Sequence, residues 1–122
     1  MPERPRSQLF VRHLPLFLDY LSVEKGLARN SLSAYESDLT AFGLHLAAAG
    51  LDTQDVTREV VVGYLGAKRA EGVSPRSVAR ATSALRGFFR FLAGEKVIAG
   101  DPTADMENAR RWSILPKLLT RD

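Results

Sequence analysis

Four arginines between residues 75 and 94 could do chemistry together if that stretch is a helix. They recur at Arg76, Arg80, Arg86 and Arg90. At about 100° per residue they share one side of an α-helix, within an arc of about 120°. Arginine binds phosphate through two parallel hydrogen bonds, and it can read the major-groove edge of guanine in the same way. The pattern therefore indicates a surface that binds a polyanion such as DNA.

The residues between these arginines on the same arc are small, and none of them is acidic. They are Ala79, Ser83 and Gly87. Like charges at this spacing repel each other unless an anion neutralises them. Small neighbours also let a helix approach a grooved partner closely. A DNA-facing helix is therefore the preferred interpretation, and a basic face that is simply exposed to solvent is the alternative.

The stretch that carries the arginines has a clear helix start and an apolar side. Ser74 is a suitable N-cap, Pro75 fits the first helical position, and we expect the helix to end near Gly94. The side opposite the arginines is predicted to face the core, and it consists of Val78, Ala81, Leu85, Phe88, Phe89 and Leu92.

A second predicted helix, over residues 29–49, offers a complementary surface. Its apolar stripe follows a 3-4-3-4 spacing through Leu32, Tyr35, Leu39, Phe42 and Leu46, and Gly50 closes it. The opposite face carries short, mostly hydrogen-bonding residues, namely Asn30, Ser33, Ser37, Thr40 and Ala41. Such a face could lie in a major groove with hydroxyls and amides near phosphates or bases. Because short polar residues are common on solvent-exposed helices, an ordinary exposed face is the alternative.

Two further segments complete the expected fold. Apolar residues at helical spacing predict a helix over 13–25 that starts near His13, because a first turn tolerates Pro15. An earlier start near Ser7 would need a kink at Pro15. Thr57 is a plausible N-cap for a helix that ends at Gly72; its valine run would also suit a strand, but nothing else in the chain offers a partner strand. A turn over 100–103 follows. The predicted class is all-α, a compact bundle of four main helices.

Charge is distributed unevenly along the 122 residues, whose formal net charge is +3. Residues 13–67 hold three basic and seven acidic groups, whereas residues 68–96 hold seven basic and two acidic groups. A polyanion-binding face requires an asymmetry of this kind. The basic surplus thus coincides with the predicted arginine helix.

Composition excludes several classes of function. The chain has no Cys and only two His, which rules out disulfides and thiolate zinc sites and leaves little for a metal cluster or a Ser-His-Asp site. No apolar run approaches the ~20 residues of a membrane span, and the first ten residues lack a signal-peptide core, so we expect a cytoplasmic protein. We expect no catalytic residue, no metal and no cofactor.

Two blocks of the sequence resemble the amino-terminal domain of tyrosine recombinases, the phage integrase family. Residues 24–35 read EKGLARNSLSAY and continue to Asp38-Leu39, against a family pattern of roughly EKxLAxNTLxAYxxDL, with Ser31 where Thr is usual. The second block comprises SPRSVAR at 74–80, SALR at 83–86 and FFRFL at 88–92. A third, shorter match is DPT at 101–103 with LPK at 115–117. The Xer subgroup is the most similar.

This resemblance implies a SAM-like core-binding domain that forms half of a clamp around double-stranded DNA at a recombination half-site, in chromosome dimer resolution or DNA integration. In that family the second and fourth helices of this domain address the major groove. The implied contacts are Asn30, Ser33 and Ser37 on the second helix and Arg76, Arg80, Ser83, Arg86 and Arg90 on the fourth. Partner recombinase subunits are expected in the full-length protein, without a metal or nucleotide cofactor.

The resemblance also implies that catalysis belongs to a separate carboxy-terminal domain. We expect residues 1–108 to form the DNA-binding domain with a short flexible amino-terminal arm, and residues 109–122 to be a linker toward an absent catalytic domain. Arg110, Arg111 and Lys117 could follow the phosphate backbone there. The tyrosines at 20, 35 and 64 fall in helical core patterns and are predicted to be packing residues, so this fragment would not be an enzyme.

Two other functions fit the residues. A standalone helical DNA-binding regulator would use the same basic face, and a helical protein-interaction module would turn the arginines toward an acidic partner.

Overall fold

The computed structural model describes residues 4–106, and this part of the chain is helical and contains no strand. Four main helices and one short 3-10 helix follow in the order α1 (Arg4–Val23), α2 (Arg29–Ala49), η1 (Thr53–Asp55), α3 (Arg58–Ala70) and α4 (Pro75–Gly94). The predicted all-α class with four main helices is confirmed. None of these described helices is long and apolar enough to cross a bilayer.

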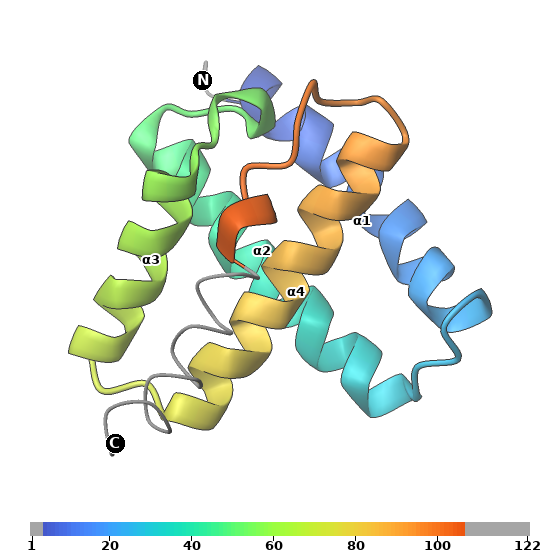
Figure 1. Cartoon of the computed structure of the whole chain (residues 1–122), viewed down its shortest axis with the longest axis horizontal. Helices are drawn as coiled ribbons and strands as arrows, with labels where there is room; N and C mark the ends of the chain where they lie inside the picture. The colour runs from blue at the N-terminus through green and yellow to red at the C-terminus, as the bar shows by residue number, and fades with distance from the viewer. Residues whose placement is uncertain (1–3, 107–122) are drawn as a thin grey trace, which may run out of the picture.

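Helix α4 is the central element of the fold. It lies across the middle of the molecule in front of α2, with α3 on one side and α1 on the other (Figure 1). It contacts each of the other three main helices, and α1 packs along α2. One side of the arginine-bearing helix is therefore committed to the core.

Aromatic side chains fill that core. The ring of Phe88 lies 5.5 Å from that of Phe17, and Phe42 packs edge-on against Phe89 at 6.1 Å and Tyr64 at 4.9 Å between ring centroids. The four phenylalanines are at most 1% exposed. Rings in edge-on contact add about 0.5–1.5 kcal/mol per pair beyond burial, so α1, α2, α3 and α4 are held in one packing arrangement.

Local capping signals set the ends of three helices as the sequence predicts. Gly50 adopts a left-handed φ of 73° and closes α2 with its N–H donating to carbonyls of the last turn. The hydroxyls of Thr57 and Ser74 accept hydrogen bonds from backbone N–H groups in the first turns of α3 and α4, and Pro75 follows as the first residue of α4. The three predicted boundaries are confirmed.

The predicted start of the first helix near His13 is wrong. Helix α1 begins at Arg4, which places Pro15 inside it. An interior proline costs about 3 kcal/mol because it removes one backbone hydrogen bond. The longer helix buries Phe10 to 3% exposure against Phe42 and Phe88, and full burial of such a ring contributes about 1.5–3 kcal/mol. Tertiary packing of Phe10 thus offsets most of the cost of the proline.

Candidate nucleic-acid interface

The polar face predicted on α2 is exposed. Each of its five members lies at the surface of the structure, namely Asn30, Ser33, Ser37, Thr40 and Ala41. The opposite stripe is buried, with Leu39 and Phe42 at 0% and Leu46 at 3% exposure. This part of the wheel prediction is confirmed, whereas the contact of these residues with DNA remains a prediction.

The four arginines of α4 are less equivalent than the wheel indicates. Arg76, Arg80 and Arg90 are exposed, and Arg86 is half-buried beside the half-buried Ser83. The core side consists largely of the predicted residues, except that Ala84 is fully buried and Ala81 only half-buried. The buried sector therefore extends further around the helix than expected, because α1 and α2 both pack against it.

Arg80 is engaged by a neighbouring helix. Its Nε donates to Oδ2 of Asp38 and its Nη2 to Oδ1, both at 2.8 Å. The Arg80 side chain is 43% exposed and that of Asp38 only 12%. These hydrogen bonds raise the pKa of the Arg80 guanidinium above its usual value, so it stays charged. The expectation that no acid faces the arginines holds along α4 itself but not for the folded protein.

Gly87 does not lie on the solvent-exposed part of the arginine-bearing side of α4. A Cβ at this position would lie 3.1 Å from Cζ of Phe17, a buried ring of α1. The interpretation of Gly87 as a small residue on the DNA-facing side is therefore wrong; it is small because α1 packs there. Of the small residues, Ala79 and Ser83 remain on the outward side with Arg76.

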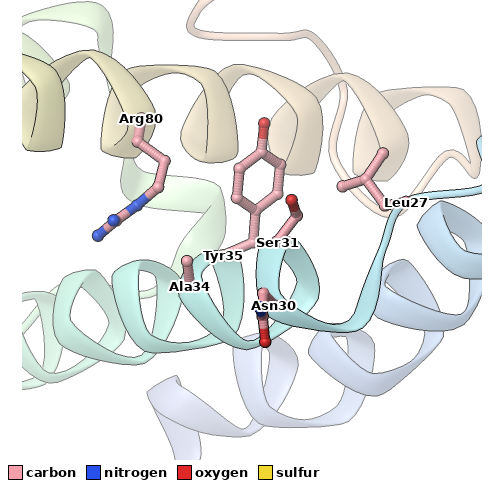
Figure 2. Close-up of a pocket in the computed structure, with 6 residues that line it drawn as sticks. All are labelled: Leu27, Asn30, Ser31, Ala34, Tyr35 and Arg80. Carbon is pink, nitrogen blue, oxygen red and sulfur yellow. The ribbon is translucent and has the colours of Figure 1, made fainter.

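A groove of about 500 Å³ runs between α2 and α4 beside the pair of Asp38 and Arg80. Figure 2 shows Arg80 extending from α4 toward α2, and the ring of Tyr35 extending from α2 toward α4. Its lining consists of Leu27, Asn30, Ser31, Ala34, Tyr35 and Arg80. Of the predicted contacts, Asn30 and Arg80 both line this groove.

The start of α2 lies at this groove and has no side-chain cap. Its N-cap residue is Ala28, which cannot accept a hydrogen bond through its side chain. The first N–H groups of a helix and its positive dipole end attract anions. Asn30 and Ser31 in the same first turn line the groove. This end of α2 is therefore electrostatically suited to a phosphate.

Sequence reasoning missed two residues near this surface. Asp38 belongs to the recognised motif, but its partner lies 42 residues away, so no local spacing reveals the pair. Lys25 shares a hollow of about 330 Å³ with Arg90, and its Nζ lies 6.0 Å from the ring centroid of Tyr20. Its place beside Gly26 in the motif was the only signal in the sequence.

The expected packing role of the tyrosines is confirmed. Tyr64 is 6% exposed, and Tyr20 and Tyr35 are half-buried against the core. Burial, followed by the charges of Asp38 and Glu71, raises the pKa of the Tyr64 phenol. A phenol with a raised pKa stays protonated at neutral pH, which does not suit a nucleophile.

The remaining predicted contacts lie outside the described residues. These are Arg110, Arg111 and Lys117, together with the predicted linker over 109–122. Their role on a phosphate backbone stays a prediction. Within residues 4–106, no group of three or more His, Cys, Asp or Glu side chains could hold a metal ion.

Comparison with known families defines the class of protein. Residues 14–96 match the family described as "Phage integrase, N-terminal SAM-like domain". This range contains α2, α3 and α4 and therefore both faces described above. The chain belongs to this family.

Individual relatives are all similar over most of the chain. It is 40% identical over 104 residues to tyrosine recombinase XerD of Pseudomonas putida, covering 85% of this chain and 35% of the relative. It is 39% identical over 108 residues to tyrosine recombinase XerD of Listeria innocua, covering 87% and 36%. The corresponding protein of Caulobacter vibrioides is 38% identical over 106 residues, covering 87% and 35%.

The chain spans about a third of the length of these curated relatives. No solved structure is similar enough to count as a match.

Proposed function

We propose that this chain is the DNA-binding domain of a site-specific tyrosine recombinase of the Xer type, and that it grips a recombination half-site through the exposed faces of α2 and α4. The observation that carries the proposal is the pairing of an outward basic face on α4 with an outward short polar face on α2. Both lie within the part of the chain that matches the family.

Each face supplies a different kind of contact. Arg76, Arg86 and Arg90 provide positive charge for phosphates or guanine edges. Asn30, Ser33 and Ser37 provide short hydrogen-bonding groups whose backbone can come close to the duplex, and the uncapped start of α2 supplies N–H groups for a phosphate.

Strand cleavage in the parent recombinase would require residues other than those described here. The relatives are named tyrosine recombinases, yet Tyr20, Tyr35 and Tyr64 of this chain pack against the core. Cleavage would then fall to a catalytic domain, and partner subunits would bring two half-sites together. This chain would bind and position the DNA, and it would not cleave it.

The proposal is tested by fluorescence anisotropy of the 122-residue chain with labelled duplex DNA across a range of salt concentrations. Each phosphate contact contributes about −0.9 to the slope of log K against log salt concentration. We expect Arg76→Ala to weaken binding and to make the slope shallower by about 0.9. A fourfold rise in salt would then cost the variant ~3.5-fold less affinity than it costs the wild type.

Arg58→Ala is the matched control, because it removes the same charge from the start of α3, where Arg58 lies 4.0 Å from Glu59. It should leave the slope unchanged. Equal slopes and affinities for Arg76→Ala, Arg58→Ala and the wild type would contradict the assigned face. Absence of duplex binding at low salt would instead favour a helical protein-interaction module.

A further inference from the structure

The pair formed by Asp38 and Arg80 joins the two helices that carry the proposed DNA-binding faces. It is a hydrogen-bonded ion pair that links α2 to α4. Nε of Arg80 lies 2.8 Å from Oδ2 of Asp38, and Nη2 lies 2.8 Å from Oδ1. The planar guanidinium thus meets the planar carboxylate through two parallel hydrogen bonds. We name this pair the α2–α4 clasp.

The geometry of the clasp constrains more than a single distance. Two parallel hydrogen bonds require the guanidinium and the carboxylate to be coplanar, which restrains both the separation of α2 and α4 and the rotation of each helix about its axis. Rotation of either helix would change how Arg76 and Ser83 of α4 are presented relative to Ser37 of α2. The relative orientation of the exposed faces of α2 and α4 therefore depends on this contact.

Burial makes the contact selective for arginine. The Asp38 side chain is only 12% exposed, and a largely buried carboxylate that loses its partner keeps its desolvation cost without compensation. A lysine at position 80 would supply a positive charge, but its single ammonium group could not form the two parallel hydrogen bonds to the carboxylate.

The clasp also changes the charge that DNA meets. A guanidinium paired with a carboxylate at 2.8 Å presents little net charge to a phosphate, so Arg80 contributes less to phosphate binding than Arg76 does. Among the arginines of α4, Arg80 thus differs in function from those that face outward.

We propose that Asp38 is a positioning residue for DNA binding and that Arg80 serves as its partner rather than as a phosphate contact. This inference rests on the proposed function. It assigns to Asp38, a residue that contacts no phosphate, control over how α2 and α4 are presented to the duplex.

The clasp itself is tested without DNA. A double-mutant cycle uses Asp38→Asn, Arg80→Gln and the double variant, with urea unfolding followed by circular dichroism at 222 nm. We expect the two single substitutions to be non-additive by about fivefold in the unfolding equilibrium constant. Additive effects would overturn the clasp.

The positioning role is tested by the salt dependence of duplex binding for the same variants. The double variant keeps the net charge of the wild type, and we expect it to keep the wild-type slope while its affinity falls severalfold, because the faces are less well held. Asp38→Asn leaves Arg80 without its carboxylate, so its slope should steepen by about 0.9. Arg80→Lys should not restore the affinity that Arg80→Gln loses.

Two results would overturn the role. A double variant whose slope becomes shallower by about 0.9, as expected for Arg76→Ala, would show that Arg80 contacts a phosphate. A double variant with wild-type affinity would show that the clasp positions nothing that DNA uses. Absence of binding by the wild type would refute the proposed function and this role together, whereas the other two results leave the proposed function standing.

Discussion

Replacement of Gly87 by alanine should destabilise the fold, although alanine is the better helix former. Its Cβ would lie 3.1 Å from Cζ and 3.7 Å from Cε1 of Phe17, whereas ordinary carbon contacts begin near 3.4 Å. The ring cannot move away easily, because it is 1% exposed and packs 5.5 Å from each of the rings of Phe88 and Phe91. The clash therefore has to be absorbed by the α1–α4 contact.

The magnitude follows from two opposing terms. Extra volume in a well-packed core costs about 1–3 kcal/mol, and replacing an interior helical glycine by alanine returns about 1 kcal/mol. We expect Gly87→Ala to lower the free energy of unfolding by about 0–2 kcal/mol. Gly63→Ala is the matched control, because a Cβ at that position in α3 meets nothing within 4 Å. It should raise the free energy of unfolding by about 1 kcal/mol.

Urea unfolding of the three proteins, followed by circular dichroism at 222 nm, measures the difference. Gly87→Ala should be less stable than Gly63→Ala by about 1–3 kcal/mol. Combining Gly87→Ala with Phe17→Leu should relieve part of the clash, so the two substitutions should be less than additive. A Gly87→Ala variant as stable as Gly63→Ala would refute the assignment of Gly87 to the α1–α4 contact.

The remaining predictions concern the cap of α4 and the pH dependence of stability. Ser74→Ala removes the hydroxyl that accepts from the backbone N–H of Ser77 at 3.1 Å, and should lower the free energy of unfolding by about 1 kcal/mol in the same assay. Burial raises the pKa of Tyr64 in the folded protein. The contribution of Tyr64 to the free energy of unfolding is therefore constant below about pH 10, the pKa of the phenol in the unfolded chain. Above that pH the unfolded chain loses the phenol proton first, and stability should fall as pH rises. Tyr64→Phe should weaken this alkaline fall in urea midpoints; an unchanged fall would contradict it.

Local sequence signals were sufficient for most of the helical framework. Thr57, Ser74 and Gly50 act within one turn of their own helix, so caps and stops can be read without knowing the fold. The start of α1 could not be read in this way. There, burial of Phe10 against α2 and α4 offsets most of the local cost of Pro15, and only the tertiary structure contains that contact.

The candidate interface was predictable only in part, for a related reason. A helical wheel sorts the residues of one helix into faces, and it gave the exposed face of α2 and most of the arginine face of α4. It contains no information about neighbouring helices. Two contacts depend on how α4 packs, namely that of Asp38 with Arg80 and that of Phe17 with Gly87. They remove Arg80 and Gly87 from the part of α4 that is free to contact DNA, which a wheel of α4 alone could not show.

The proposed binding of duplex DNA by the exposed faces of α2 and α4 can be mapped residue by residue with NMR. Isotope-labelled chain would be titrated with a short duplex at low salt, and amide shifts would be followed residue by residue. We expect the perturbed amides to cluster at Ser33, Ser37, Arg76 and Ser83, while the exposed Val62 on α3 stays unaffected. Perturbations centred on α3, or none at all, would contradict it.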